Sequence, residues 1–190
     1  MAARRALWRA RQVGLDPERL VLIDETWATT NLTRLRGRAA RGQRVVDSVP
    51  PGPWKTTTRI SALALRGIRG SLELDGAVHG LAFQAFVEPV LTPTLRPAGL
   101  VILDHLSSHK GPRVAGLVRN AQAAWVYQPP SSPALHPLSL ALSQIPPAQW
   151  ISATRTLDAL RSGLPSVLSR VTPSVAANFF RPCGYTLQIN

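Results

Sequence analysis

Three short aliphatic runs stand out in the hydrophobic pattern of the chain. Each holds four mainly apolar residues bounded by turn-forming residues, which is typical of buried strands. They are Leu20–Ile23, Leu100–Leu103 and Ala124–Tyr127. Residues 54–66 and 67–74 alternate instead between apolar and polar positions, and this alternation predicts two strands paired as a hairpin.

Amphipathic stretches among these strands predict helices. Gly80–Leu91 and Pro112–Ala123 place apolar residues at three- and four-residue spacings, as a helix packed on a sheet does. Residues 155–180 predict one or two further helices, interrupted by Pro165 and Pro173. An antiparallel start followed by alternating strands and helices favours an α/β class with a mixed sheet.

Length, composition and net charge limit the classes to which this protein can belong. The 190 residues suit one globular domain, and no run of 18 apolar residues exists, so no membrane span is expected. A single cysteine, Cys183, excludes an internal disulfide and fits a reducing compartment. The formal net charge of +12 favours a polyanionic partner, since neutralising phosphates releases counterions. The alternative is an arginine-rich composition inherited from a GC-rich coding sequence, because only Lys55 and Lys110 are lysines.

Basic residues gather in two places, a short amphipathic segment at residues 3–13 and a glycine-containing loop at residues 34–44. Such positions supply charge to a phosphate backbone without reading base sequence. The candidate DNA-contacting residues are Arg34, Arg36, Arg38, Arg41, Arg44, Lys55 and Lys110. An ordinary solvated charged surface is the alternative.

Two of the three aliphatic runs end in an acid, at Asp24 and Asp104. Ligands of α/β sheets collect beyond the carboxyl ends of parallel strands, so neighbouring strands would bring these carboxylates together. Adjacent like charges are unfavourable unless a cation lies between them. Oxygen ligands of this kind suit Mg²⁺ or Mn²⁺ and phosphodiester chemistry. The alternative is that each acid caps a turn or a helix.

Longer motifs resemble a known family. The matching stretches are I-D-E-T-W at 23–27, R-L-R-G-R-A-A-R-G at 34–42, W-K-T-T-T at 54–58, L-D-G-A-V-H-G at 74–80, L-D-H-L-S-S-H-K at 103–110, P-P-S-S-P at 129–133 and, more weakly, N-F-F-R-P-C-G-Y at 178–185. In this order they resemble the catalytic domain of DDE transposases of bacterial insertion sequences, in the branch related to mariner elements. The resemblance implies an RNase H-like fold with a mixed five-stranded sheet flanked by helices. It also implies metal-dependent DNA cleavage and strand transfer.

The same resemblance assigns roles to individual residues. It makes Asp24 the first acid, bridging two metal ions, and Asp104 the second. Glu25 would support the first acid without binding metal itself, and His109 would orient the loop after Asp104 or touch a phosphate, as would Lys110. Trp54 is expected to pack in or at the edge of the core rather than to stack on a base.

The third acid of the family is missing. The family segment resembles S-P-D-x-N-P-I-E, whereas residues 132–139 read S-P-A-L-H-P-L-S, so Ser139 stands at the glutamate position. The spacing agrees, because 139 − 104 = 35 leaves 34 intervening residues. Serine is neutral and a poor metal ligand. His136 could bind a transition metal, but, three residues upstream in a helical segment, it is expected to point elsewhere as a plain substitution. The sequence therefore predicts a very weak nuclease, with a non-catalytic DNA-binding or dimerising module, or a decayed reading frame, as alternatives.

The expected organisation is a basic N-terminal arm or helix at residues 1–19 and an RNase H-like domain at residues 20–190. The segment before Asp24 is expected to be too short for a helix-turn-helix, so sequence-specific recognition would come from a separate polypeptide or would not occur. The expected partners are transposon-end and target DNA, a second copy of the chain, and that polypeptide. The expected location is cytoplasmic, with the protein on nucleoid DNA.

Overall fold

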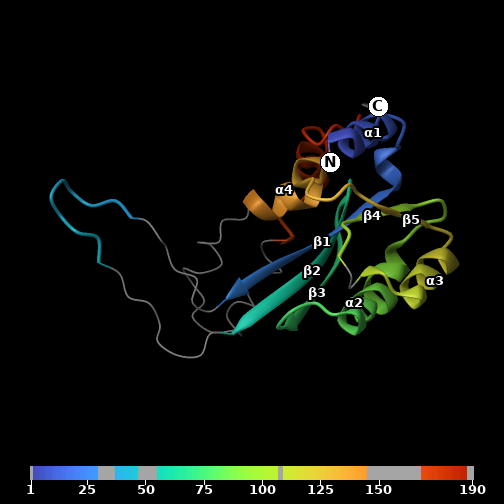
Figure 1. The fold of residues 1–190 in the computed structure, drawn as a ribbon, viewed down its shortest axis with the longest axis horizontal. Coiled ribbons are helices and arrows are strands. Elements are labelled where there is room, and N and C mark those ends of the chain that lie inside the picture. The colour runs from blue at the N-terminus through green and yellow to red at the C-terminus, as the bar shows by residue number, and fades with distance from the viewer. Residues whose placement is uncertain (1, 30–36, 47–54, 107–108, 145–167, 188–190) are drawn as a thin grey trace.

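A five-stranded mixed sheet forms the centre of the molecule (Figure 1). The computed structural model describes residues 2–29, 37–46, 55–106, 109–144 and 168–187. The strands are β1 (Leu20–Thr29), β2 (Thr56–Ala64), β3 (Gly67–Asp75), β4 (Leu100–Leu103) and β5 (Ala124–Tyr127). Their order is β3-β2-β1-β4-β5, with antiparallel pairing among the first three and parallel pairing of β1, β4 and β5. The predicted mixed five-stranded sheet is confirmed.

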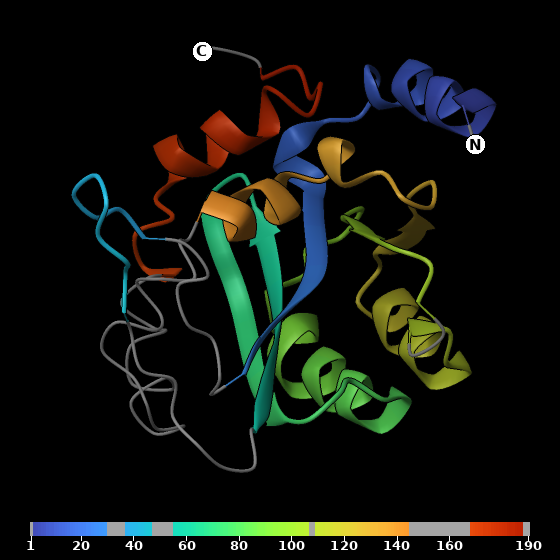
Figure 2. The same ribbon diagram turned by 60° about the vertical axis from the view of Figure 1, so that its left-hand side comes forward.

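Helical segments cover both faces of this sheet (Figure 2). One face carries α1 (Ala2–Gln12), α4 (Pro137–Gln144) and α7 (Pro173–Phe180), and the other carries α2 (Gly80–Phe86), its continuation η2 (Val87–Leu91) and α3 (Pro112–Asn120). Short turns complete the set: η1 (Pro17–Arg19), η3 (Thr92–Thr94) and η5 (Pro133–Leu135).

Alternation along β1 and β4 builds a core on each face. Leu22 and Ile102 pack with Leu138 of α4 and Phe180 of α7, whereas their neighbours Ile23 and Leu103 pack against α2 and α3. Because both faces are covered, these strands read as continuous apolar runs rather than as alternating ones.

The first strand is longer than the sequence pattern predicted. Its parallel pairing with β4 stops at Leu22 opposite Ile102, but β1 continues to Thr29 on its antiparallel pairing with β2. Asp24 and Glu25 therefore lie inside a strand rather than after it. The aliphatic run marks only the part of β1 that is covered on both faces, which explains why the pattern ended too early.

Two predicted helices also have different ends. The predicted helix at 80–91 exists, but its second half, η2, has π-helical bonding around Pro89, whose nitrogen has no hydrogen to donate. The helix predicted to reach Ala123 ends at Asn120, because Gln122 turns the chain with a φ of 56°. Pro173 begins α7 at a position where its missing N–H is not needed.

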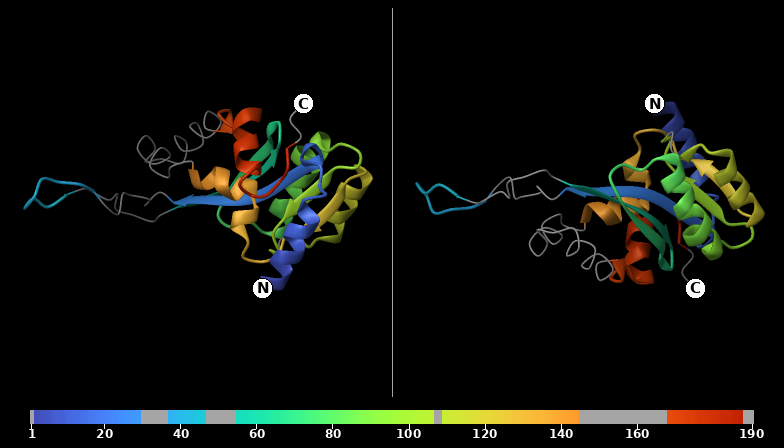
Figure 3. Two further views of the ribbon diagram at one scale, coloured as in Figure 1. Left: turned by 90° about the horizontal axis from the view of Figure 1, so that it is seen from above. Right: turned by 90° about the horizontal axis from the view of Figure 1, so that it is seen from below.

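The β1–β2 hairpin extends beyond the body of the molecule, and residues 37–46 lie well away from the sheet (Figures 1 and 3). Trp27 near its base is 66% exposed. Trp54 and residues 145–167 lie outside the described residues. Within the described part of the chain, no helix is long and apolar enough to cross a membrane.

Candidate functional site

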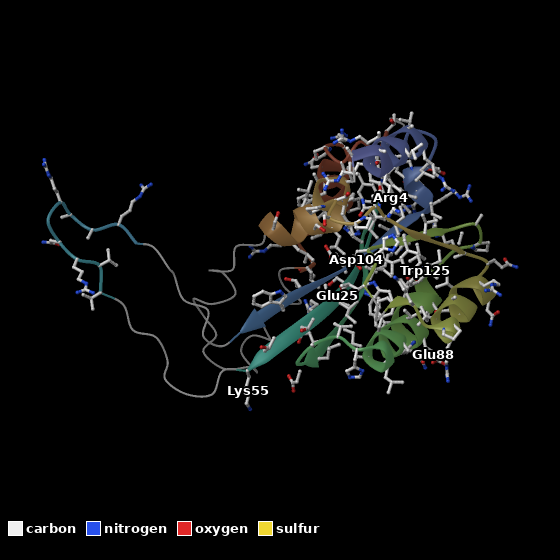
Figure 4. The ribbon with its side chains drawn as sticks, viewed as in Figure 1. Arg4, Glu25, Lys55, Glu88, Asp104 and Trp125 are labelled. Carbon is white, nitrogen blue, oxygen red and sulfur yellow. The ribbon has the colours of Figure 1, made fainter. Side chains whose placement is uncertain are left out.

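Of the two acids predicted to hold a metal, Asp24 lies in β1, and Asp104 directly follows the end of the neighbouring strand β4. Leu22 pairs with Ile102, so Asp24 and Asp104 each follow that pair by two residues. Asp24 contacts Ser139 of α4, whereas Asp104 contacts His109, whose ring packs on Phe83. Asp104 and Glu25 lie close together where β1 leaves β4 (Figure 4).

The Asp24 carboxylate is held from two sides. Its Oδ1 accepts a hydrogen bond of 2.9 Å from the backbone N–H of Glu25, and its Oδ2 accepts one from the Ser139 hydroxyl at the first turn of α4. His136 Nδ1 lies 3.8 Å from the same Oδ2. Ser139 thus contacts Asp24, at the place where the sequence pattern expects a third acid.

His136 faces Asp24 rather than pointing elsewhere, so the expectation for this residue was wrong. Pro137 follows it and disfavours helical backbone at His136, which adopts φ −115° and ψ 101°. The ring therefore sits ahead of α4, where Nδ1 accepts a 3.3 Å hydrogen bond from the backbone N–H of Ser139. Burial lowers the pKa of His136 below its ordinary value, although the nearby charges of Asp24 and Asp104 oppose this effect.

On the opposite side of β1, His109 joins two carboxylates. Its Nε2 lies 2.6 Å from Glu25 Oε1, and its Nδ1 lies 3.0 Å from Asp104 Oδ1. The ring packs on Phe83 with a centroid distance of 4.2 Å. Asp104 Oδ1 also accepts a 3.1 Å hydrogen bond from the backbone N–H of Leu106.

Electrostatics makes His109 a cation in this position. Burial opposes its charge, but the carboxylates of Asp104 and Glu25 outweigh burial and raise the pKa of His109 to about 9. Burial likewise opposes the charge of Asp104, but contacts with His109 and Leu106 outweigh it and lower the Asp104 pKa. Glu25, Asp104 and His109 have metal-binding side chains within reach of one another. Because each ring nitrogen already faces a carboxylate, the imidazolium itself occupies the place of a cation there.

This arrangement predicts a pH-dependent stability. The folded-state pKa of His109, about 9, lies above its ordinary value of 6.5, so its contribution is complete below pH 6.5 and is lost as the pH rises through 9. Urea unfolding without metal should therefore show a loss on the order of 3 kcal/mol across this range. His109→Asn should remove most of that loss, and an equally steep loss in the variant would contradict the assignment.

The predicted DNA-contacting residues do not gather around the two acids. Arg38, Arg41 and Arg44 are exposed on the distant segment 37–46, and Arg34 and Arg36 lie outside the described residues. Lys55 is exposed just before β2 (Figure 4), and Lys110 is exposed beside His109. The sites for phosphate would therefore lie along the hairpin and next to the acids rather than in one patch.

The side chains around Asp24 fit a divalent cation. Asp24 is 24% exposed and Asp104 50%, and no Lys or Arg among the described residues forms an ion pair with either. Partly buried carboxylates are oxygen donors of the kind that Mg²⁺ and Mn²⁺ use, although Asp104 already has His109 as a partner. The metal assignment of Asp24 and Asp104 stays a prediction.

Comparison with known proteins decides the family. A model of the family described as DDE superfamily endonuclease matches residues 19–159. The chain belongs to this family. No curated protein matches it in sequence. The family match spans β1 through α4 and includes Asp24, Asp104 and the Ser139 position.

Solved structures confirm the RNase H-like fold of this DDE endonuclease chain. It is similar to the Mos1 transposase paired-end complex with left transposon end, with a TM-score of 0.75 and 16% identity over 96% of this chain and 57% of that chain. It is also similar to the Mos1 transposase catalytic domain with Raltegravir and Mg, with a TM-score of 0.69 and 13% identity over 95% of this chain and 88% of that one. The chain therefore spans little more than half of the Mos1 chain in the paired-end complex.

Sequence reasoning missed two features of this DDE endonuclease site. The dipeptide His136–Pro137 signals a non-helical residue just before a helix, and this could have placed the imidazole at the start of α4. Arg5 of α1 donates to the Ser131 carbonyl at 2.6 Å and to the Ser132 hydroxyl at 3.2 Å. Nothing in the local sequence pattern connects residues so far apart.

Proposed function

We propose that this chain is the catalytic domain of a DNA transposase whose cleavage activity is weakened by Ser139. The observation that carries the proposal is the position of Asp24 and Asp104 beside the last parallel pair of β1 and β4, with α4 bringing Ser139 onto Asp24. This is the arrangement expected of a DDE endonuclease whose third carboxylate has been replaced. The family match and the fold support the same activity class.

In this proposal, Asp24 and Asp104 hold Mg²⁺ or Mn²⁺. When bound, such an ion activates a water and stabilises the leaving oxygen of a phosphodiester. The backbone N–H of Glu25 and the hydroxyl of Ser139 orient the Asp24 carboxylate. His109, fixed by Glu25, holds Asp104 Oδ1, so Asp104 Oδ2 would be the oxygen that binds an ion. Two solved relatives are named as Mos1 paired-end complexes with Mn and with Mg, which agrees with this choice of cation.

DNA is the proposed partner. Arg38, Arg41 and Arg44 contact phosphates along the extended hairpin, and Arg34 and Arg36 belong to the same basic run. Lys110 lies near enough to the acids to contact a phosphate close to the cleavage point, and Lys55 lies at the base of the hairpin. Sequence-specific recognition comes from another polypeptide carrying a helix-turn-helix, and a second copy of the chain completes the assembly. A cytoplasmic location on nucleoid DNA accompanies this function.

The metal site is tested by Asp24→Asn. This variant is expected to weaken Mn²⁺ binding at least about 10-fold, since even residues that only support a metal ligand are worth that much. The loss of the free-ion electron paramagnetic resonance signal measures binding directly. Asp16→Asn is the matched control, because Asp16 caps η1 away from the site and asparagine can keep that cap. Equal Mn²⁺ affinity in wild type and Asp24→Asn would remove the basis of the proposal.

A second candidate function is a non-catalytic DNA-binding or dimerising module derived from a transposase. The specific observation in its favour is Ser139, which gives Asp24 a hydrogen bond but offers no charge to a metal ion. In this case DNA binding persists through the arginines while cleavage stays absent, even after the third acid is restored.

A further inference from the structure

The first helix of the chain contacts the loop that leads to Ser139. Arg5 of α1 donates from Nη2 to the Ser131 carbonyl at 2.6 Å and from Nε to the Ser132 hydroxyl at 3.2 Å. We infer that Arg5 is a positioning residue, which sets the place of Ser139 against Asp24 through the turn that precedes α4. This inference rests on the proposed function, in which the residue at position 139 faces a metal-binding Asp24.

The backbone of α1 is itself fixed on the domain. Trp8 is buried in the core on the face of the sheet that carries α4, and Gln12 donates from Nε2 to the Cys183 carbonyl. Arg5, Trp8 and Gln12 follow one another at spacings of three and four residues, so they share one side of the helix. The side of α1 that packs on the domain is therefore the side that presents Arg5 to the loop.

The loop that Arg5 contacts has an uncommon backbone conformation. Ser131 has a φ of 54°, in the left-handed region that serine rarely adopts, and such a residue keeps this conformation only where its surroundings hold it. The shorter bond from Arg5 ends on the Ser131 carbonyl and so fixes the peptide that joins Ser131 to Ser132. The Ser132 hydroxyl in turn donates to the Pro130 carbonyl at 3.3 Å. Removing the guanidinium therefore loosens both the peptide and the hydroxyl.

A continuous series of hydrogen bonds connects this loop to the site. The Ser132 carbonyl accepts the backbone N–H of Leu135 at 3.0 Å and closes η5, and α4 begins two residues after Leu135. His136, between η5 and α4, accepts the backbone N–H of Ser139 at 3.3 Å, and the Ser139 hydroxyl donates to Asp24. Only seven positions (139 − 132) separate the Arg5 contact from Ser139. A shift of the turn therefore changes the direction in which α4 starts.

Amide hydrogen exchange of the full chain, measured by nuclear magnetic resonance without metal or DNA, tests this role. Arg5→Gln is expected to raise the exchange rates of the Leu135 and Ser139 amides about 10-fold, since hydrogen bonds from charged groups are the stronger ones. The Leu22 amide in β1 should exchange as in the wild type, because Leu138 is fully buried and keeps α4 on the sheet. A general loss of stability would instead speed exchange in the core strands as well.

Arg9→Gln is the matched control. Arg9 is exposed on the same helix and forms no hydrogen bond or ion pair within the part of the chain that the structure describes. The control removes the same charge and should leave exchange at Leu135 and Ser139 unchanged. Arg5→Lys should restore part of the protection, because an ammonium can reach one of the two acceptors but cannot bridge them as a guanidinium does. Wild-type exchange in Arg5→Gln, or an equal increase at Leu22 or in Arg9→Gln, overturns the positioning role.

DNA nicking connects this role to catalysis. In the Ser139→Glu protein, Arg5→Gln should lower the Mg²⁺-dependent nicking rate at saturating plasmid DNA about 10-fold, because a displaced carboxylate supports the ion less well. The half-saturating DNA concentration should match that of Arg9→Gln in the same background, since both variants lose one charge. An unchanged nicking rate overturns the inference. Absence of nicking by Ser139→Glu itself counts against the proposed function, and exchange at the Ser139 amide then still decides the role of Arg5.

Discussion

Replacing Ser139 with glutamate is expected to raise Mg²⁺-dependent nicking of supercoiled plasmid DNA at least about 100-fold, because ligands that act as a unit lose most of their effect when one is missing. The Ser139 hydroxyl already donates to Asp24 Oδ2, so a carboxylate at this position reaches the same ion. The third position of a helix also favours glutamate, since its charge faces the positive end of the helix dipole. The substitution therefore adds a ligand without opposing the fold.

The control for this experiment is Ser143→Glu, one turn further along α4. Ser143 is exposed and bonds to the Leu140 carbonyl, so the variant adds the same charge away from Asp24. Nicking should stay at the wild-type level in this control. If Ser139→Glu folds and binds metal without faster nicking, the chain is a non-catalytic module, and the transposase proposal fails in its catalytic part.

Comparing Mg²⁺ with Mn²⁺ gives the Ser139→Glu experiment a second readout. Glutamate at 139 makes the site richer in oxygen, so the gain should be larger with Mg²⁺ than with Mn²⁺. A gain of equal size with both ions would show that the added oxygen ligand does not set the metal preference of the site. The rate measured for each ion in wild type and variant provides this comparison.

Glu73→Gln is expected to lower the free energy of unfolding by about 3–5 kcal/mol, the usual effect of removing one partner of a buried ion pair. Arg59 and Glu73 lie opposite each other on β2 and β3 and form an ion pair, with their side chains only 7% and 15% exposed. Burial lowers the pKa of Arg59, and Glu73 opposes that effect. Two other nitrogens of Arg59, Nε and Nη1, have no hydrogen-bond partner among the described residues. Glutamine therefore leaves a buried guanidinium without its counter-charge.

Urea unfolding followed by circular dichroism measures this loss, and Glu18→Gln provides the control. Glu18 pairs with Arg66 at 3.2 Å, but both side chains are about half exposed, at 49% and 57%. A solvent-exposed pair contributes about 0–1 kcal/mol, so the control should unfold almost as the wild type does. Equal losses in the two variants would show that burial of the Arg59–Glu73 pair has no special energetic effect.

The sequence alone determined the secondary structure wherever burial on both faces left an unmistakable apolar run. It predicted β4 and the start of β1 at the observed positions, because a strand between two helical layers must be apolar throughout, and it also placed the edge strand β5 correctly. It could not predict the end of β1. After Leu22 the strand is held by β2 alone, and such pairing depends on partners 27 to 39 residues away in the sequence.

For the candidate site too, the sequence determined one part and the tertiary structure the other. Motif and spacing were enough to single out Asp24, Asp104 and the Ser139 position, since the order of chemical groups along a chain is itself sequence information. Only the tertiary structure placed the imidazole of His136 against Asp24 and made His109 a cation between Glu25 and Asp104. Side-chain direction, burial and the charges that neighbours impose arise when distant segments pack, and no local pattern encodes them.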